Sequence, residues 1–290
     1  MKIRLGSKCP FNLEATLCCG QTFRWNKQGE WWYGVVRDKA FKLCQIGNEL
    51  EFEDVDADFV KDYFGLADDL PRIYSQIGRD VQMTNAIETF RGLRILHQDP
   101  WECLISYICA TYKNISAIKQ MLFNLSKRFG DKIDFEGNIF HTFPNAERLA
   151  KASLKELREC SLGYRAKFVS ETAKTVREND FEFERLRRAP YERAKAELLD
   201  FPGVGRKVAD CVLLFSLGKV DAFPVDVWIR RAIVRHYASY FPDKFVNRIR
   251  GQKSLTDSEY EKLNSFGRKH FGKYAGYAQE YLYHYERMQT

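Results

Sequence analysis

The chain has 290 residues, of which 45% are hydrophobic, 14% aromatic and 29% charged. This composition is sufficient for a sizeable core in one or two domains, and it excludes long disordered or fibrous architectures. No run of 18 apolar residues occurs, so we predict no transmembrane helix and no membrane partner.

Positive charge is concentrated in the C-terminal two thirds of the chain. The whole sequence has 46 Lys and Arg against 39 Asp and Glu, a net charge of +7. Residues 1–100 hold 13 basic and 15 acidic residues, whereas residues 101–290 hold 33 basic and 24 acidic ones. This asymmetry indicates either a polyanionic partner or a charge excess that serves solubility.

The eight cysteines form no disulfide or metal-binding pattern. Cys18 and Cys19 are adjacent, no C-x-x-C pair occurs, and no four-cysteine cluster near the C-terminus could hold an iron–sulfur centre. We therefore expect most thiols to be buried in a reducing compartment, and we predict no metal held by side chains.

The N-terminal third is typical of antiparallel strands. Residues 23–36 and 39–53 each contain two apolar runs around a polar turn with glycine, and the alternation in LCQI and LEFE indicates half-buried strands. The acidic segment 53–66 follows, with carboxylates placed to favour a helix start.

From about residue 70 onward the spacing of apolar residues predicts helices. The segments are 81–96, 100–112, 115–130, 146–160, 165–180, 191–201, 207–217, 226–240, 257–271 and 276–288. We predict an α+β fold, with a small antiparallel β domain and a flanking helix at 1–80 and a mostly helical body at 81–290.

The most informative motif is LLDFPGVGRKVADCVLLF at 198–215, which predicts two helices joined by a tight hairpin. The glycines at 203 and 205 allow positive φ and leave the backbone uncovered, so the amides around Val204 are expected to bind a phosphate without reading sequence. The alternative is an ordinary turn between two helices.

Lys207 begins the second helix of this motif, and Asp226 follows 19 residues later in DAFPVDVWIRRAI. The arrangement resembles the helix-hairpin-helix DNA glycosylases, whose active site is a Lys and an Asp at these places. Otherwise Lys207 is a solvated charge and Asp226 a helix N-cap, a role that is compatible with catalysis because a cap is held rigidly.

The resemblance narrows to the 8-oxoguanine DNA glycosylase/AP lyases, as a prokaryotic-type member without the iron–sulfur cluster of the endonuclease III branch. Five segments match in the family's order: CGQTFRW (19–25), QDPWECLISYICA (98–110), LGYRAKFVS (162–170), PGVGRKVADC (202–211) and YAGYAQEYLY (274–283). The resemblance implies a monomer, inside the cell, that acts on duplex DNA containing 8-oxoguanine. Its place is the cytoplasm or nucleoid of a prokaryote, or the nucleus of a eukaryote.

The resemblance also implies roles for individual residues. Lys207 supplies the amine that attacks the sugar, and Asp226 stabilises the positive charge that develops there. The extruded base lies between Cys211 and Tyr283, where the family usually has Phe, and Gln279 reads its edge. The remaining substrate-binding residues are Gly20, whose carbonyl accepts the extra N–H of the oxidised base, Gln21, Pro224 and Trp228. The four-residue spacing places Lys207 and Cys211 on one face of their helix, and Gln279 and Tyr283 on one face of the last helix. The alternative is that Cys211 and Tyr283 are core residues and Gly20 is a turn residue.

The chain departs from the eukaryotic pattern at three places. Tyr112, or alternatively Asn114, is expected to fill the vacated base stack. Ala117 stands where an Arg reads the opposite cytosine, although the companions of that Arg, Tyr164 and Arg165, are present. Trp228 stands where a His contacts a phosphate, and an indole cannot carry charge.

We expect no required cofactor, although the resemblance implies a structural monovalent or divalent cation at the backbone carbonyls near Leu199, Phe201 and Val204. Two other functions are weighed: a monofunctional alkyl-base glycosylase, which needs only the Asp, and a non-catalytic helix-hairpin-helix DNA-binding protein. The pairing of Lys207 with Asp226 argues against both.

Overall fold

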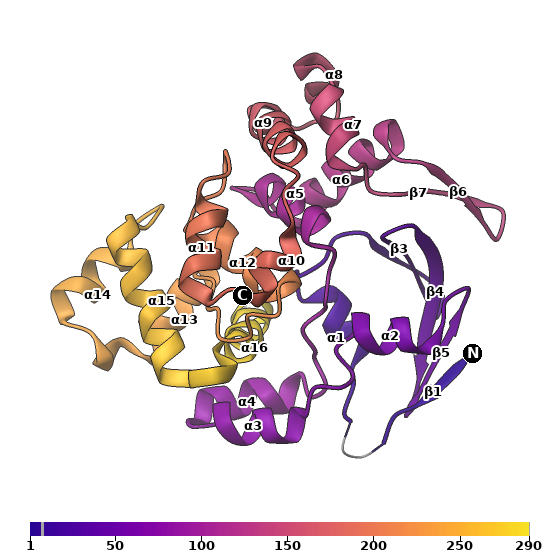
Figure 1. The fold of residues 1–290 in the computed structure, drawn as a ribbon. Coiled ribbons are helices and arrows are strands. Elements are labelled where there is room, and N and C mark those ends of the chain that lie inside the picture. The colour runs from indigo at the N-terminus through magenta and orange to yellow at the C-terminus, as the bar shows by residue number, and fades with distance from the viewer. Residues whose placement is uncertain (7–8, 290) are drawn as a thin grey trace.

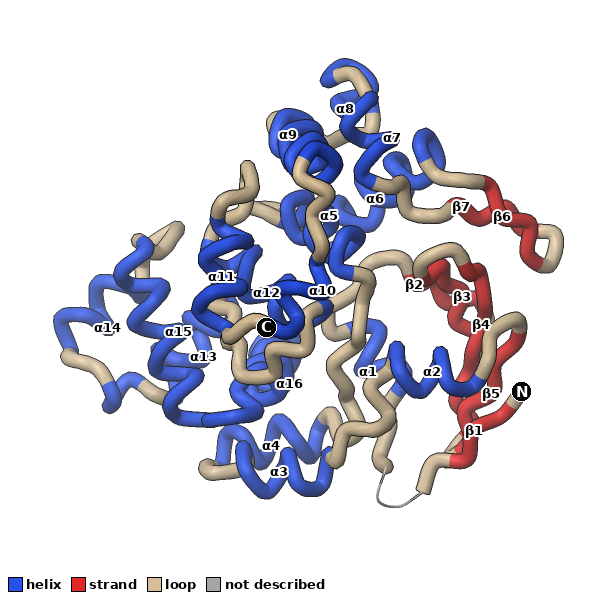
Figure 2. Tube along the Cα trace, viewed as in Figure 1, coloured by secondary structure: helices blue, strands red, loops and turns tan. Residues whose placement is uncertain are grey.

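A small antiparallel sheet is joined to a larger helical body in the computed structural model, which describes residues 1–6 and 9–289 (Figure 1). The sheet and a separate two-stranded hairpin lie on one side, and helices form the rest (Figure 2). The predicted α+β class is confirmed. No helix in this described part of the chain is long and apolar enough to span a bilayer.

The sheet has the order β1-β5-β4-β3-β2, and all neighbours are antiparallel. Its strands are β1 (Lys2–Arg4), β2 (Trp25–Gln28), β3 (Trp31–Val36), β4 (Lys39–Ile46) and β5 (Glu49–Glu53). Both predicted hairpins are confirmed, with turn glycines Gly29 and Gly47 at φ +59° and +56°. Position 34 requires glycine, because a Cβ there would lie 2.5 Å from the Trp25 indole on the neighbouring strand.

The acidic segment after the sheet forms α2 (Ala57–Tyr63), as expected. Asp56 caps it by accepting the Phe59 amide at 2.7 Å, and Asp58 lies in the first turn, where a negative charge is favourable. The Trp25 indole donates to the Tyr63 hydroxyl at 3.0 Å, so this helix is fixed to the sheet.

The helical body shares one large buried apolar cluster, and six of the eight thiols are buried, as predicted. The helices besides α2 are α1 (Leu13–Cys18), α3 (Leu70–Ile77), α4 (Val81–Thr89), α5 (Pro100–Ala110), α6 (Ile115–Phe129), α7 (Ala146–Lys151), α8 (Leu154–Glu159), α9 (Arg165–Glu178), α10 (Phe183–Arg188), α11 (Tyr191–Leu199), α12 (Arg206–Ser216), α13 (Val227–His236), α14 (Asp243–Arg250), α15 (Asp257–Phe271) and α16 (Ala275–Met288), with 3₁₀ turns η1 (Ala238–Tyr240) and η2 (Gly272–Tyr274).

The mostly helical body contains a pair of strands that the sequence did not predict. A hairpin of β6 (Lys132–Phe135) and β7 (Asn138–His141) interrupts the helices. Its turn has Glu136 and Gly137 at φ +52° and +72°. The hairpin is stabilised from outside, because the Phe140 ring stacks on Tyr33 of β3 with centroids 6.3 Å apart.

Helix α16 joins the C-terminus to the N-terminal part of the chain. The Tyr281 hydroxyl donates to the Leu93 carbonyl at 2.9 Å and lies 2.8 Å from the Tyr74 hydroxyl. The same helix carries Glu280, which is 2% exposed and has a carboxylate oxygen without a hydrogen-bond partner among the described residues. Burial raises the pKa of this carboxyl to about 7, although contact with Cys19 and the charge of Arg287 oppose the rise.

The raised pKa of Glu280 predicts that folding stability depends on pH. A carboxyl whose pKa is higher in the folded state contributes stability at low pH, and this contribution is lost between the ordinary value of about 4.5 and about 7. We expect wild type to lose about 3 kcal/mol relative to Glu280→Gln between pH 4.5 and 8. Urea unfolding of both proteins measures the difference, with exposed Glu30→Gln as the control; a difference that is constant with pH would contradict the prediction.

Candidate active site

The hairpin between α11 and α12 presents bare backbone to the solvent. Gly203 has φ +79°, and a Cβ there would lie 2.6 Å from the Phe168 ring. Gly205 is the N-cap of α12, and no side chain among the described residues caps the first turn. The Val204 amide is used inside the turn, where it donates to the Phe201 carbonyl at 3.1 Å. The first-turn amides of α12 therefore remain available for an anion.

The hairpin carbonyls fit the expected cation only in part. The Phe201 carbonyl already accepts the Val204 amide, and the described residues contain no group of three or more His, Cys, Asp or Glu side chains that could hold a metal ion. A cation at Leu199, Phe201 and Val204 would be held by carbonyls alone, and it stays a prediction.

Lys207 and Asp226 line the same cavity, which has a volume of about 840 Å³. The Lys207 ammonium lies 4.6 Å from the centroid of the Tyr107 ring. Asp226 is the N-cap of α13, and its Oδ1 accepts the amides of Trp228 and Ile229, both at 2.9 Å. Burial raises the pKa of the Asp226 carboxyl, whereas these amides and the charge of Lys207 oppose the rise.

The cavity brings together about half of the predicted site residues, which come from five separate segments: Gly20, Tyr112, Asn114, Gly203, Gly205, Lys207, Asp226, Trp228 and Tyr283. Four further predicted residues are buried and do not line the cavity: Cys211, Val204, Pro224 and Gln279. Burial raises the pKa of the Cys211 thiol to about 12, so this sulfur is neutral at physiological pH. The Gln279 Oε1 is buried and finds no hydrogen-bond donor within the described chain.

Gly20 forms the turn that follows α1. Its φ is +102°, and a Cβ would lie 3.0 Å from the Arg287 guanidinium and 3.2 Å from the Tyr283 hydroxyl. Only glycine fits this close approach to α16. The turn thereby places its backbone against the helix that carries Gln279.

Gln21 holds this turn in place from inside the protein. Its side-chain amide donates to the carbonyls of Thr16 and Arg94 at 3.0 and 2.8 Å, and its Oε1 accepts the Leu96 amide at 2.8 Å. Its own carbonyl accepts the Gln98 side chain at 2.8 Å. Because Gln21 is fully buried, its side chain supports the turn and does not face the cavity.

The sequence analysis missed Arg287, which links the turn at Gly20 to helix α16. Its guanidinium donates to the Cys18 carbonyl at 2.6 Å and to the Tyr283 hydroxyl at 3.3 Å. The hydroxyl that distinguishes Tyr283 from the usual Phe thus has a partner. A signal was present, since Gln279, Tyr283 and Arg287 repeat at four-residue spacing and share one helix face.

Tyr112 and Asn114, the two residues predicted to fill the space left by the extruded base, have different surroundings in the segment after α5. Tyr112 is 82% exposed and has φ +55°. Asn114 caps α6, because its side chain accepts the Ala117 amide at 2.9 Å. The Tyr112 side chain is exposed, whereas the Asn114 Oδ1 is already used as a helix cap, and which of the two fills the stack stays a prediction.

The residues predicted to read the opposite base lie outside the cavity lining. Tyr164 is exposed, whereas Arg165 is only 3% exposed and its guanidinium donates to the Thr111 carbonyl. The Arg165 guanidinium also lies 4.4 Å from the Tyr164 ring centroid. In this structure, Arg165 fixes the loop that carries Tyr112.

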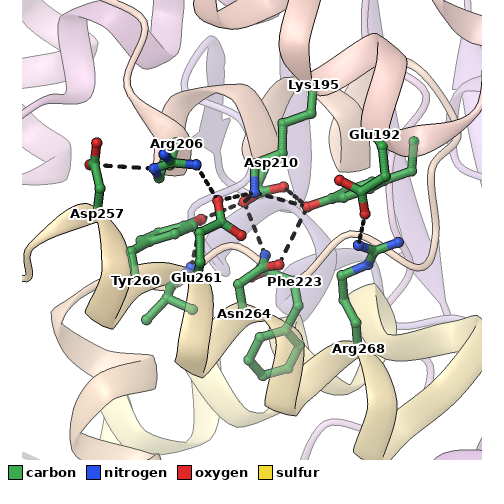
Figure 3. A network of polar contacts seen from close by, with 12 residues as sticks. Glu192, Lys195, Arg206, Asp210, Phe223, Asp257, Tyr260, Glu261, Asn264 and Arg268 are labelled. Atoms are coloured by element: carbon green, nitrogen blue, oxygen red, sulfur yellow. Dashed lines mark hydrogen bonds and ion pairs between the residues drawn. The ribbon is translucent and has the colours of Figure 1, made fainter.

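A buried polar network fixes α12 behind Lys207 (Figure 3). Asp210, three residues after Lys207, is fully buried and accepts hydrogen bonds from the Tyr191 and Tyr260 hydroxyls, the latter at 2.6 Å. It also accepts the Asn264 side chain at 3.0 Å and lies 3.2 Å from the Lys195 ammonium. These contacts connect α12 to α11 and α15.

Arg206, the neighbour of Lys207, is part of the same network (Figure 3). It forms ion pairs with Glu261 at 2.6 Å and Asp257 at 3.4 Å. Two carboxylates therefore face its positive charge, and Lys207 extends toward Tyr107 instead.

Comparisons with known proteins agree with this geometry. Residues 4–104 match a family model described as 8-oxoguanine DNA glycosylase, N-terminal domain, and residues 105–249 match one described as HhH-GPD superfamily base excision DNA repair protein. The N-glycosylase/DNA lyase of Arabidopsis thaliana is 31% identical over 93% of this chain and 76% of its own length. A probable N-glycosylase/DNA lyase of Methanothermobacter thermautotrophicus is 32% identical over 77% and 72%.

Solved structures lead to the same family. The apo-form of Clostridium acetobutylicum 8-oxoguanine glycosylase/lyase is 32% identical and superposes with a TM-score of 0.85 over 95% of this chain and 93% of its own. The same enzyme with double-stranded DNA containing cytosine opposite 8-oxoguanine is 30% identical, also with a TM-score of 0.85, over 96% and 92%. The fold, the hairpin and the paired Lys207 and Asp226 place the chain in the same group: it belongs to the 8-oxoguanine DNA glycosylase/lyase family of helix-hairpin-helix proteins.

Proposed function

We propose that this chain excises 8-oxoguanine from duplex DNA and then cleaves the strand, with Lys207 as nucleophile and Asp226 as its electrostatic partner. The observation that carries the proposal is the meeting of these two residues in one cavity whose wall includes Gly20 and the hairpin glycines. The chain is proposed to act as a monomer, inside the cell where DNA is found.

The proposed reaction uses Lys207 as a neutral amine. Its lone pair attacks C1′ of the sugar while the bond from C1′ to N9 breaks and the base leaves with the bonding electrons. The amine nitrogen then loses a proton and the C1′–O4′ bond breaks, with the proton going to O4′, which opens the sugar ring and leaves a Schiff base between Lys207 and C1′. Loss of a proton from C2′ finally expels the 3′ phosphate oxygen as the C3′–O3′ bond breaks. Asp226 stabilises the positive charge that develops on the sugar, and its two amide hydrogen bonds fix its orientation.

Recognition of the base is proposed to depend on the Gly20 carbonyl. No described residue donates a hydrogen bond to it, whereas the nearby carbonyls of Thr16, Cys18 and Gln21 all accept one. An N–H at N7 occurs in 8-oxoguanine and is absent from guanine, so a free acceptor favours the oxidised base. The unpaired Gln279 Oε1 is available to a donor on the Watson–Crick edge.

Removal of the amine is expected to abolish chemistry and preserve binding. Lys207→Gln should show no base excision and no covalent product when borohydride is added to an 8-oxoguanine duplex, because no Schiff base can form. Affinity for the same duplex should change by less than about tenfold, since most contacts are to phosphates. Trapping of the variant near the wild-type level would overturn the mechanism.

Loss of charge at Asp226 is expected to slow excision without unfolding the protein. Asp226→Asn should reduce the single-turnover rate by about 100-fold or more, as removal of an electrostatic stabiliser does. Asn is also a good N-cap, so stability should fall by less than about 1 kcal/mol. Single-turnover kinetics and thermal unfolding check both parts; a variant that unfolds would show that the cap is the dominant role.

The link through Arg287 is expected to support discrimination against guanine. Arg287→Met removes the bond to the Cys18 carbonyl and frees the Gly20 turn from α16, so the rate ratio of 8-oxoguanine to guanine excision should fall by about tenfold. Tyr283→Phe keeps the ring and loses only the 3.3 Å contact, so it should have a smaller effect. Equal rate ratios in wild type and Arg287→Met would contradict this role.

The preference for cytosine opposite the lesion is expected to be weak. Ala117 cannot read a base, and Arg165 is engaged by the Thr111 carbonyl. One bidentate Arg contact contributes about 1–3 kcal/mol of discrimination, so without it the rates opposite the four bases should differ by less than about tenfold. Single-turnover excision opposite each base at fixed salt measures this, with Ala117→Arg as the variant expected to increase selectivity. A cytosine preference above 100-fold in wild type would show that another residue reads the partner strand.

A further inference from the structure

Arg230 is a buried arginine that has no protein partner. It lies on α13, is 8% exposed, and lines the cavity that contains Lys207 and Asp226. Its guanidinium makes no hydrogen bond or ion pair with any residue that the structure describes; only its backbone amide is bonded, to the Asp226 carbonyl at 2.9 Å. An arginine that is nine-tenths buried without a carboxylate is uncommon, because burial of an unpaired charge is costly.

The acidic groups around this cavity form no hydrogen bond or ion pair with Arg230, although the charge of Asp226 acts on it from a distance. The described residues that line it include two carboxylates, Asp226 and Asp257. Asp226 accepts two amides of its own helix, and Asp257 pairs with Arg206 at 3.4 Å. The cationic residues that line the cavity outnumber these two carboxylates; they are Lys113, Arg206, Lys207, Arg230, Lys253 and Arg287.

The position of Arg230 follows from helical spacing. It is four residues after Asp226, so the two side chains leave α13 on the same face. Arg231 instead lies over the Trp228 ring, with its guanidinium 4.7 Å from the ring. Lys253, in the segment between α14 and α15, is exposed and lines the same cavity. Two cations from separate elements thus reach one space beside the first turn of α12.

We propose that Arg230, together with Lys253, forms a phosphate subsite that binds a backbone phosphate next to the extruded nucleotide. A phosphate oxygen takes the place of the absent carboxylate, and the planar guanidinium binds it with two parallel hydrogen bonds. This inference rests on the proposed function, because it assigns a further contact to the same DNA strand. It makes Arg230 a DNA-binding residue of α13, beside the backbone site at the hairpin.

The first test compares DNA binding by Arg230→Met with wild type. The probe is a duplex containing a stable tetrahydrofuran abasic analogue opposite cytosine. We expect about tenfold weaker binding at 0.1 M salt, and a log–log salt slope smaller by about 0.9, as for one lost phosphate contact. Arg230→Lys should recover part of the affinity, and Arg72→Met, an exposed arginine on α3 outside the cavity, should match wild type. Unchanged affinity and slope in Arg230→Met would overturn the proposal.

A second measurement separates binding from a structural role. Arg230 loses no protein partner when replaced, so the melting temperature of free Arg230→Met should equal or exceed that of wild type. A clearly lower melting temperature together with unchanged DNA affinity would show that the residue serves the fold alone.

A third measurement locates the phosphate. Single neutral methylphosphonates are placed at successive positions around the abasic analogue. At the contacted position the replacement should weaken wild type and leave Arg230→Met almost unaffected, because both changes remove the same interaction. If the loss of affinity caused by the methylphosphonate and the loss caused by Arg230→Met were additive at every position, the proposed subsite would be overturned. Borohydride trapping of wild type on an 8-oxoguanine duplex is run in parallel: its failure would overturn the proposed chemistry, whereas these affinities would still report on Arg230.

Discussion

The site depends on the hydrogen bonds that hold the turn at Gly20 between the buried interior and the last helix. Gln21 uses both ends of its side-chain amide inside the protein, bonding to the Arg94 carbonyl and the Leu96 amide. Arg287 then connects the Cys18 carbonyl to Tyr283 on the last helix. The Gln21 bonds are buried, where an unmade hydrogen bond is costly, whereas the bond from Arg287 to the Cys18 carbonyl is exposed. The turn at Gly20 is therefore held against α16, and neither segment can move without breaking the other's contacts.

The catalytic pair has a different kind of support. Lys207 extends from α12, whose far side is fixed by Asp210 and the hydroxyls of Tyr191 and Tyr260. Asp226 is fixed by backbone amides at the start of α13. Two rigid helices, α12 and α13, thus converge on one cavity, and the catalytic residues lie at their first turns, where backbone groups are left for ligands. Such an arrangement provides orientation before the substrate arrives, which is the larger part of the catalytic effect of a charged group.

Local patterns in the sequence predicted local structure well. The strand hairpins, the helix-hairpin-helix and the Asp226 cap follow from residues close together in the chain, and all are confirmed. The hairpin of β6 and β7 was missed because its stability comes from Tyr33, about 100 residues away. The roles of Gln21 and Arg287 could not be predicted for the same reason: their partners lie in other segments. The boundary between domains at 80 and the individual roles of site residues stay predictions.

Some of the buried polar groups without hydrogen-bond partners lie near the place where DNA is proposed to bind, whereas others, such as those of Ser126 and His270, are outside the cavity lining. Gln279 and Glu280 on α16 each have a buried oxygen that finds no donor in the described structure, and Arg230 on α13 forms no ion pair with a described residue. Most buried polar groups in proteins are satisfied, so such exceptions require a reason. A core built only for stability would pair or replace them. Their proximity to Lys207 and Asp226 indicates that this part of the protein is completed by its ligand, with a donor for Gln279 and a phosphate for Arg230. The unpaired polar groups then lower the folding stability of the free protein, and binding of the substrate recovers that free energy by supplying their partners.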